Sequence, residues 1–134
     1  MQALYQWQLT AQDPKDIYGQ FLEDQDVERA DLEYFHELLF EVVERRPELD
    51  AALTPHTDRG VEAVDPVERA ILRIGAYELL HRMDVPYRVV VNEGIELAKK
   101  FGAEGSHKFV NGVLDKLARQ TRELELSMPA KGSS

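Results

Sequence analysis

Cysteine is absent from the 134 residues, which excludes disulfide bonds and thiolate metal sites. No run of about 18 or more apolar residues is present, and the first residues lack the charged and then apolar order of a secretion signal. A hydrophobic content of 43% is enough for a core without covalent cross-links. These absences predict a soluble cytoplasmic domain that does not contact a membrane.

Residue patterns that carry catalysis or bind cofactors are also missing. The histidines are scattered and lack the spacing of a helical metal site, and no glycine-rich phosphate loop is present. Ser106 and His107 are sequence neighbours, which is poor geometry for a nucleophile and its base. We therefore expect a protein that is not an enzyme, with no metal and no cofactor.

Basic residues are scarce, with 16 Lys and Arg against 25 Asp and Glu, but they are unevenly distributed. Residues 1–85 hold 8 basic and 19 acidic side chains, a net charge of −11, whereas residues 86–122 hold 7 and 4, a net charge of +3. An acidic surface suits a basic protein partner, and a local basic patch suits a phosphate backbone.

Hydrophobic periodicity predicts an all-α protein. Asp65 is a good helix cap, Pro66 fits the first helical position, and Glu68 is placed to complete a capping box. Val89-Val90-Val91 is the one segment that suggests a strand, but the apolar spacing continues as a helix to Phe101, and Gly102 is a natural stop. Helices are expected over about 2–11, 16–22, 31–46, 48–53, 66–84, 89–101 and 106–122.

The width of the apolar face after residue 65 predicts a central, largely buried helix. The chain should therefore form two packed helical bundles that share this helix. We expect a single all-helical domain over residues 1–126 and a flexible tail over residues 127–134.

A basic loop with two aromatic side chains joins the last two predicted helices. His107 and Lys108 are expected just after a cap at Ser106, where positive charge opposes the helix dipole but suits a phosphate. Phe101 is the better stacking platform for a base, since helical spacing favours core packing for Phe109. The candidate RNA-binding residues in this region are Lys99, Lys100, Phe101, Ser106, His107, Lys108 and Phe109.

Four segments, residues 67–74, 84–87, 92–102 and 106–116, together resemble the NusB family of bacterial transcription antitermination factors. The similarity spans nearly the whole chain. It implies an all-helical compact domain of two three-helix bundles, in agreement with the periodicity. It also implies a non-catalytic adaptor that binds boxA, a single-stranded RNA element in leaders of ribosomal RNA operons.

The resemblance further implies a protein partner, NusE, a small-subunit ribosomal protein, and assembly with other Nus factors on RNA polymerase. By the resemblance, Gln2 at the start of the first helix extends the RNA-binding surface. The surface for NusE would be Tyr5, Glu62, Glu68 and Arg69.

Two departures from the family pattern stand out. An arginine-rich arm usually comes immediately before the segment that here begins at Met1, whereas this chain has no basic residue before Lys15. We expect a start upstream of Met1 or, failing that, a weaker electrostatic contribution to RNA binding. Gly105 stands where an acidic residue is usual, which predicts a more mobile junction.

Two other functions stay open at the level of sequence. Some rRNA cytosine methyltransferases carry a NusB-like RNA-recognition domain, although this chain shows no cofactor motif and no nucleophilic cysteine. Alternatively, the domain is structural and self-associates through an apolar face. The sequence does not decide between a monomer and a homodimer.

Overall fold

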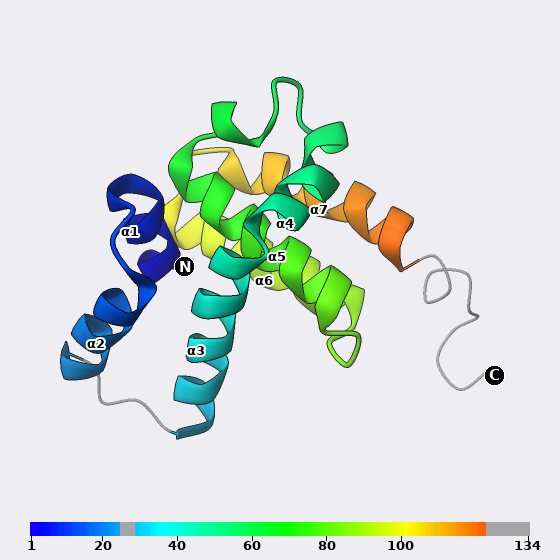
Figure 1. Cartoon of the computed structure of the whole chain (residues 1–134). Helices are drawn as coiled ribbons and strands as arrows, with labels where there is room; N and C mark the ends of the chain where they lie inside the picture. Colours follow the sequence, from blue (N-terminus) through cyan, green and yellow to red (C-terminus); the bar gives the residue numbers. More distant parts are fainter. Residues whose placement is uncertain (25–28, 123–134) are drawn as a thin grey trace.

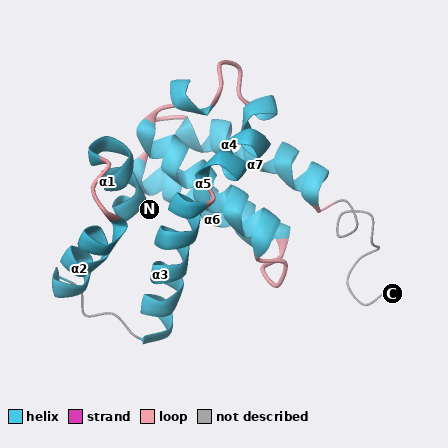
Figure 2. Ribbon diagram, viewed as in Figure 1, coloured by secondary structure: helices cyan, strands magenta, loops and turns pink. Residues whose placement is uncertain are grey.

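A computed structural model of the chain describes residues 1–24 and 29–122, and every regular element in these residues is helical (Figures 1 and 2). The all-α prediction is confirmed, including the helical state of Val89-Val90-Val91. The expected tail, residues 127–134, and the end of the expected domain, residues 123–126, lie outside the described residues. The elements are α1 Gln2–Thr10, α2 Pro14–Asp24, α3 Arg29–Glu44, α4 Arg46–Leu53, η1 Thr54–His56, η2 Val61–Ala63, α5 Pro66–His81, α6 Tyr87–Phe101 and α7 Ser106–Thr121.

The helices form two groups that meet at α5. Helices α1, α2 and α3 pack on one another, α5, α6 and α7 form the second group, and α4 lies against α5. Figure 1 shows α1 to α3 on one side of the molecule and α5 to α7 on the other. Since α1 and α3 also pack on α5, this helix belongs to the interior of both groups.

Sequence explains why α5 takes the central place. Asp65 Oδ2 accepts hydrogen bonds from the backbone amides of Val67 and Glu68, and Pro66 occupies the first turn, as predicted. Every residue from 69 to 79 is buried, so the helix is covered on all sides rather than along one stripe. The expected capping box does not form, because Glu68 Oε2 accepts a hydrogen bond from Ser106.

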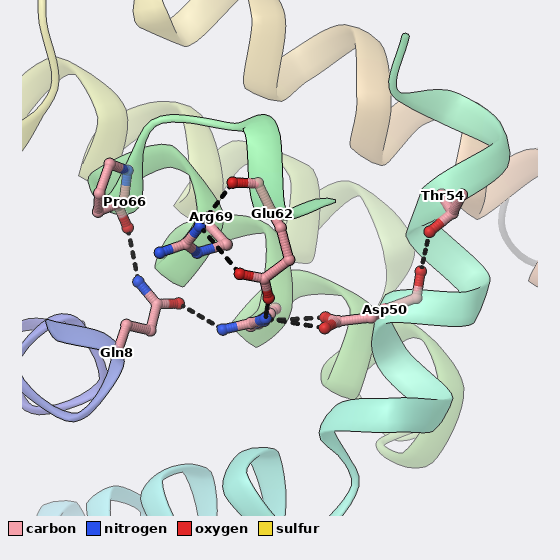
Figure 3. A network of polar contacts seen from close by, with 7 residues as sticks. Gln8, Asp50, Thr54, Glu62, Pro66 and Arg69 are labelled. Atoms are coloured by element: carbon pink, nitrogen blue, oxygen red, sulfur yellow. Dashed lines mark hydrogen bonds and ion pairs between the residues drawn. The ribbon is translucent and has the colours of Figure 1, made fainter. Parts of the chain in front are cut away.

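Arg73 is the polar centre of this interior, with only 2% of its surface exposed. Its Nε and Nη2 donate to the two carboxylate oxygens of Asp50 at 2.9 and 2.8 Å, and Nη2 also contacts Glu62 Oε1 at 3.1 Å. Its Nη1 donates to Gln8 Oε1 at 2.9 Å, and Gln8 Nε2 donates to the carbonyl oxygen of Pro66 at 2.8 Å. Figure 3 shows this network, which ties α1, α4 and η2 to α5.

A second polar set joins α3 to the C-terminal half of α5. Tyr77 Oη donates to Glu37 Oε2 at 2.6 Å, and Arg82 Nη1 donates to Glu37 Oε1 at 2.7 Å. Tyr34 donates to the carboxylate of Glu78. Burial raises the pKa of the Glu78 carboxyl, and the hydrogen bond from Tyr34 acts in the opposite direction. These contacts hold the two groups of helices together at a second point.

The C-terminal end of α5 is closed by a buried arginine from the end of α7. Arg122 donates to the carbonyl oxygens of Leu79, Val85, Glu78 and Arg82 at 2.9 to 3.0 Å. A cation at this position donates to carbonyl groups at the end of α5 and in the turn that follows, and it complements the negative end of the helix dipole. The two ends of α5 are thus fixed by an aspartate cap and an arginine cap.

We predict that Arg73→Met lowers the free energy of unfolding by about 3 kcal/mol, because Asp50 loses a bidentate partner and stays partly buried. Urea denaturation followed by circular dichroism measures the change. Arg119→Met is the matched control, since Arg119 forms an exposed pair with Asp115 whose loss should cost less than about 1 kcal/mol. Equal losses for both variants would contradict a central role for Arg73.

Candidate nucleic-acid and partner interface

The basic loop between α6 and α7 is exposed, as its composition requires. Lys99 and Lys100 lie in the last turn of α6, where they also favour the helix dipole. Lys100 Nζ lies 5.3 Å from the ring centroid of the half-buried Phe101, and Lys99 Nζ lies 3.8 Å from Glu96 Oε2. Lys108 is exposed in the first turn of α7. The loop therefore presents three lysines and a partly accessible aromatic ring.

The expected cap at Ser106 is wrong by one residue. The N-cap of α7 is Gly105, whose φ of 83° lies in the left-handed region that glycine tolerates at no steric cost. Ser106 is the first helical residue, only 4% exposed, and its Oγ donates to Glu68 Oε2 at 2.7 Å. Gly105 thus serves the backbone turn, and Ser106 is an internal contact rather than part of the accessible RNA surface.

Gly102 has a role that the helix-stop interpretation does not predict. It ends α6 with an extended backbone, not with the left-handed cap typical of glycine. A Cβ atom added there would lie 2.6 Å from Ser106 Oγ and 2.8 Å from the carbonyl oxygen of Ala98. The glycine therefore makes room for the Ser106 side chain, and with it for the contact to Glu68.

Phe109 does not pack in the core, contrary to the preference from helical spacing. The residue is 38% exposed, while Val110, Val113, Leu114 and Leu117 form the buried stripe of α7. Phe109 lies about 100° around the helix from Val110, at the edge of this stripe. Of the two phenylalanines, Phe109 is therefore the more accessible, whereas Phe101 packs partly against its surroundings.

The four residues predicted for the protein partner differ in exposure. Glu62 is exposed and Tyr5 is half-buried against the core. Arg69 is 9% exposed and donates through Nη1 to the backbone oxygen of Glu62 at 3.1 Å, while its Nε has no hydrogen-bond partner in the described structure. Glu62 Oε1 also accepts a hydrogen bond from the buried Arg73, so η2 and the start of α5 are linked to the central polar network (Figure 3).

Phe109 of α7 and Glu68 of α5 line one shallow hollow of about 360 Å³, one from the predicted RNA surface and the other from the predicted partner surface. The opposite wall comes from residues 57–60 and 63–65. The sequence pattern marks the first part of this wall, through Gly60, only as an irregular stretch, and it predicts no role for the wall beyond the cap at Asp65. Its Thr57-Asp58-Arg59-Gly60 composition is a turn signal, but nothing local places it beside Phe109. Gln2 is exposed at the first residue of α1, in the other group of helices.

Other kinds of site find little support in the described parts of the chain. Residues 1–24 and 29–122 hold no group of three or more His, Asp or Glu side chains arranged to bind a metal ion. No helix among them combines the length and the apolar character needed to cross a membrane.

Comparison with known proteins identifies both the family and the fold of the chain. The model of the NusB family matches residues 1–119. The chain belongs to the NusB family. It is 61% identical over 127 residues to the transcription antitermination protein NusB of Alcanivorax borkumensis, covering 95% of this chain and 85% of that protein. It is 55% identical to the NusB protein of Xanthomonas campestris, covering 93% and 79%.

Solved structures of the family share the arrangement of helices. NusB from T. maritima superposes with a TM-score of 0.82 at 27% identity, covering 95% of this chain and 91% of that one. NusB in a complex with NusE and double-stranded RNA gives a TM-score of 0.79 at 30% identity, with coverage of 88% and 89%. The expected NusB-like fold is therefore confirmed.

We predict that Gly102→Ala destabilises the protein by about 2 kcal/mol, because the new methyl group overlaps Ser106 and the Ala98 carbonyl oxygen. Gly112→Ala, within α7, is the matched control. No atom lies within 4 Å of a Cβ added at Gly112, so alanine there should stabilise the helix by up to about 1 kcal/mol. Thermal unfolding of both variants compares them, and a stable Gly102→Ala protein would refute the steric role.

Proposed function

We propose that this chain is a non-catalytic RNA-binding adaptor in transcription antitermination. It binds a boxA-type single-stranded RNA jointly with NusE, and the pair joins RNA polymerase with other Nus factors. The proposal is supported by the combination of family membership with the arrangement of basic and aromatic side chains around the α6–α7 loop. The chain is 61% identical over 127 residues to a transcription antitermination protein and presents exposed lysines beside accessible aromatic rings.

The RNA surface centres on the α6–α7 loop. Lys99, Lys100 and Lys108 supply positive charge. The amides of Ser106 and Lys108 donate to the carbonyl oxygens of Ala103 and Gly105, but the N-terminus of α7 has no side-chain cap and its dipole favours a phosphate. Phe109 offers the larger exposed ring for stacking on a base, with Phe101 beside Lys100 as a second platform. His107 is half-buried in the same turn. Gln2 completes the proposed surface only through the family resemblance.

The partner surface is proposed at the start of α5. Glu62, Glu68 and Arg69 lie close together at the start of α5, and their acidic character suits a basic ribosomal protein. Tyr5 on α1 joins the proposed surface through the family resemblance. A related NusB structure contains NusE together with double-stranded RNA, which supports a surface that takes a protein and an RNA at once. A bacterial cytoplasmic location follows from this function.

The decisive experiment is fluorescence anisotropy of a labelled boxA-type single strand, titrated with the chain alone and with NusE. We expect saturable binding that NusE tightens roughly 5- to 150-fold, because linked binding sites share a favourable coupling free energy of about 1 to 3 kcal/mol. The same sequence annealed to its complement is the control, since stacking on Phe109 requires unpaired bases. If NusE neither binds the chain nor tightens RNA binding, the adaptor function is excluded.

Salt dependence tests the lysine at the start of α7. Lys108→Ala should reduce the slope of log K against log salt by about 0.7, the contribution of one phosphate contact to a single strand. Lys15→Ala in α2 is the control, because Lys15 is equally exposed but lies in the other group of helices. Identical slopes for Lys108→Ala and the unmodified chain would remove Lys108 from the RNA surface.

A further inference from the structure

Glu68 belongs to both proposed surfaces at once. It lies in the first turn of α5 next to Arg69, on the face proposed for the protein partner. Its carboxylate reaches across 38 positions of sequence to Ser106, the first residue of α7, at 2.7 Å. It also lines the hollow that Phe109 lines from the RNA side. A single side chain therefore lies where a protein ligand and an RNA ligand would meet.

The charge of Glu68 is not compensated by a cation. Glu62 pairs with Arg69 and Arg73, and Asp65 caps two backbone amides. The hydrogen-bond partner of Glu68, by contrast, is the neutral hydroxyl of Ser106, and no ion pair to Glu68 occurs within residues 1–24 and 29–122. One full negative charge therefore stands against the start of α7 in the unbound protein.

This charge has opposite effects on the fold and on RNA. A carboxylate beside a helix N-terminus is favourable, because it faces the positive end of the dipole, and α7 lacks a side-chain cap of its own. An RNA phosphate approaching Lys108 at the same end meets the same positive potential and is repelled by the carboxylate. The carboxylate thus occupies the electrostatic position that a phosphate would take.

We propose that Glu68 is the residue that makes RNA binding depend on the protein partner. A basic side chain of the partner pairs with Glu68, cancels its charge at the α7 N-terminus and thereby raises the affinity of the loop for phosphate. The Ser106 hydroxyl donates to this carboxylate, but it is the charge of Glu68, and not this hydrogen bond, that acts on the phosphate. This inference rests on the proposed adaptor function and adds the residue through which the two ligands are coupled.

The coupling through Glu68 is reciprocal by thermodynamic linkage. If the partner raises RNA affinity by neutralising Glu68, RNA raises partner affinity by the same factor. Neutralising Glu68 by mutation should reproduce the partner's electrostatic effect on RNA while adding no contact. One unit charge about 8 Å from a phosphate, in surroundings between water and protein surface, changes affinity roughly threefold.

The test compares Glu68→Gln, Ser106→Ala and the control Glu23→Gln, in which an exposed carboxylate of α2 is neutralised far from α7. RNA affinity is measured by anisotropy for each full chain, alone and at saturating NusE. We expect Glu68→Gln to bind RNA roughly threefold more tightly than the unmodified chain when alone. At saturating NusE the two should bind RNA equally, because Glu68 is neutral in both complexes.

The other variants separate charge from hydrogen bonding. Ser106→Ala keeps the carboxylate charge, so it should show no gain in RNA affinity. Glu23→Gln should also show none, since screening removes charge effects beyond about 10 Å at ordinary ionic strength. The gain from Glu68→Gln should shrink as salt is raised. Circular dichroism and thermal unfolding confirm that each variant is folded before its affinity is compared.

Three results would overturn the inference. In the first, Glu68→Gln alone binds RNA no more tightly than the unmodified chain. In the second, Glu23→Gln gains as much, so that only overall charge matters. In the third, Ser106→Ala gains as much, so that the hydrogen bond and not the charge restrains RNA. These outcomes leave the adaptor function intact if the unmodified chain still binds RNA with NusE, whereas loss of that binding overturns both proposals.

Discussion

The interaction on which the architecture depends is the burial of the Arg73 guanidinium among three other elements. A charge at 2% exposure is tolerated only when its donors are satisfied, and here Asp50, Glu62 and Gln8 accept from all three nitrogens. Because these partners come from α4, η2 and α1, satisfying one arginine fixes three elements against α5. The geometry of a planar fork with fixed donor directions makes this constraint specific as well as stabilising.

The burial of Arg73 also fixes the positions of residues in the two proposed binding surfaces. Glu62 is held by Arg73 from within and by Arg69 from beside it, so η2 cannot shift without disturbing the start of α5. The start of α5 in turn contacts the start of α7 through Glu68 and Ser106, and Gly102 leaves room for that contact. A rigid path of named contacts therefore runs from the central network to the RNA loop. A series of contacts between two sites does not by itself show that binding energy is transmitted between them. The uncompensated charge of Glu68, by contrast, acts on a nearby phosphate directly through electrostatic repulsion.

Features that depend on neighbouring residues are predicted correctly from the sequence. Features that depend on contacts between distant segments are not. The helix start at Asp65-Pro66 and the helical state of Val89-Val90-Val91 follow from capping and periodicity, and both are confirmed. The cap at Ser106 and the inward Phe109 are wrong, since the burial of Ser106 depends on Glu68, 38 residues earlier, and Phe109 stands at the edge of its stripe. Arg73 is one of several charged residues in the buried part of α5, and no local pattern names Asp50 as its partner. The roles of the RNA and partner residues remain predictions.

The uneven distribution of charge along the chain explains why contacts at the start of α5 and α7 matter for RNA binding. A chain with a net charge of −9 is a poor RNA ligand as a whole, so affinity must come from a basic region that is separated from the acidic body. The fold achieves this separation incompletely, because α5, which belongs to the acidic part of the sequence, packs directly against α6 and α7. The boundary between the two charge regions therefore falls inside a helix–helix contact, and Glu68 is an acidic side chain at the part of that boundary next to the start of α7. A basic partner bound there acts on the RNA surface because it completes the charge separation that the chain alone leaves unfinished.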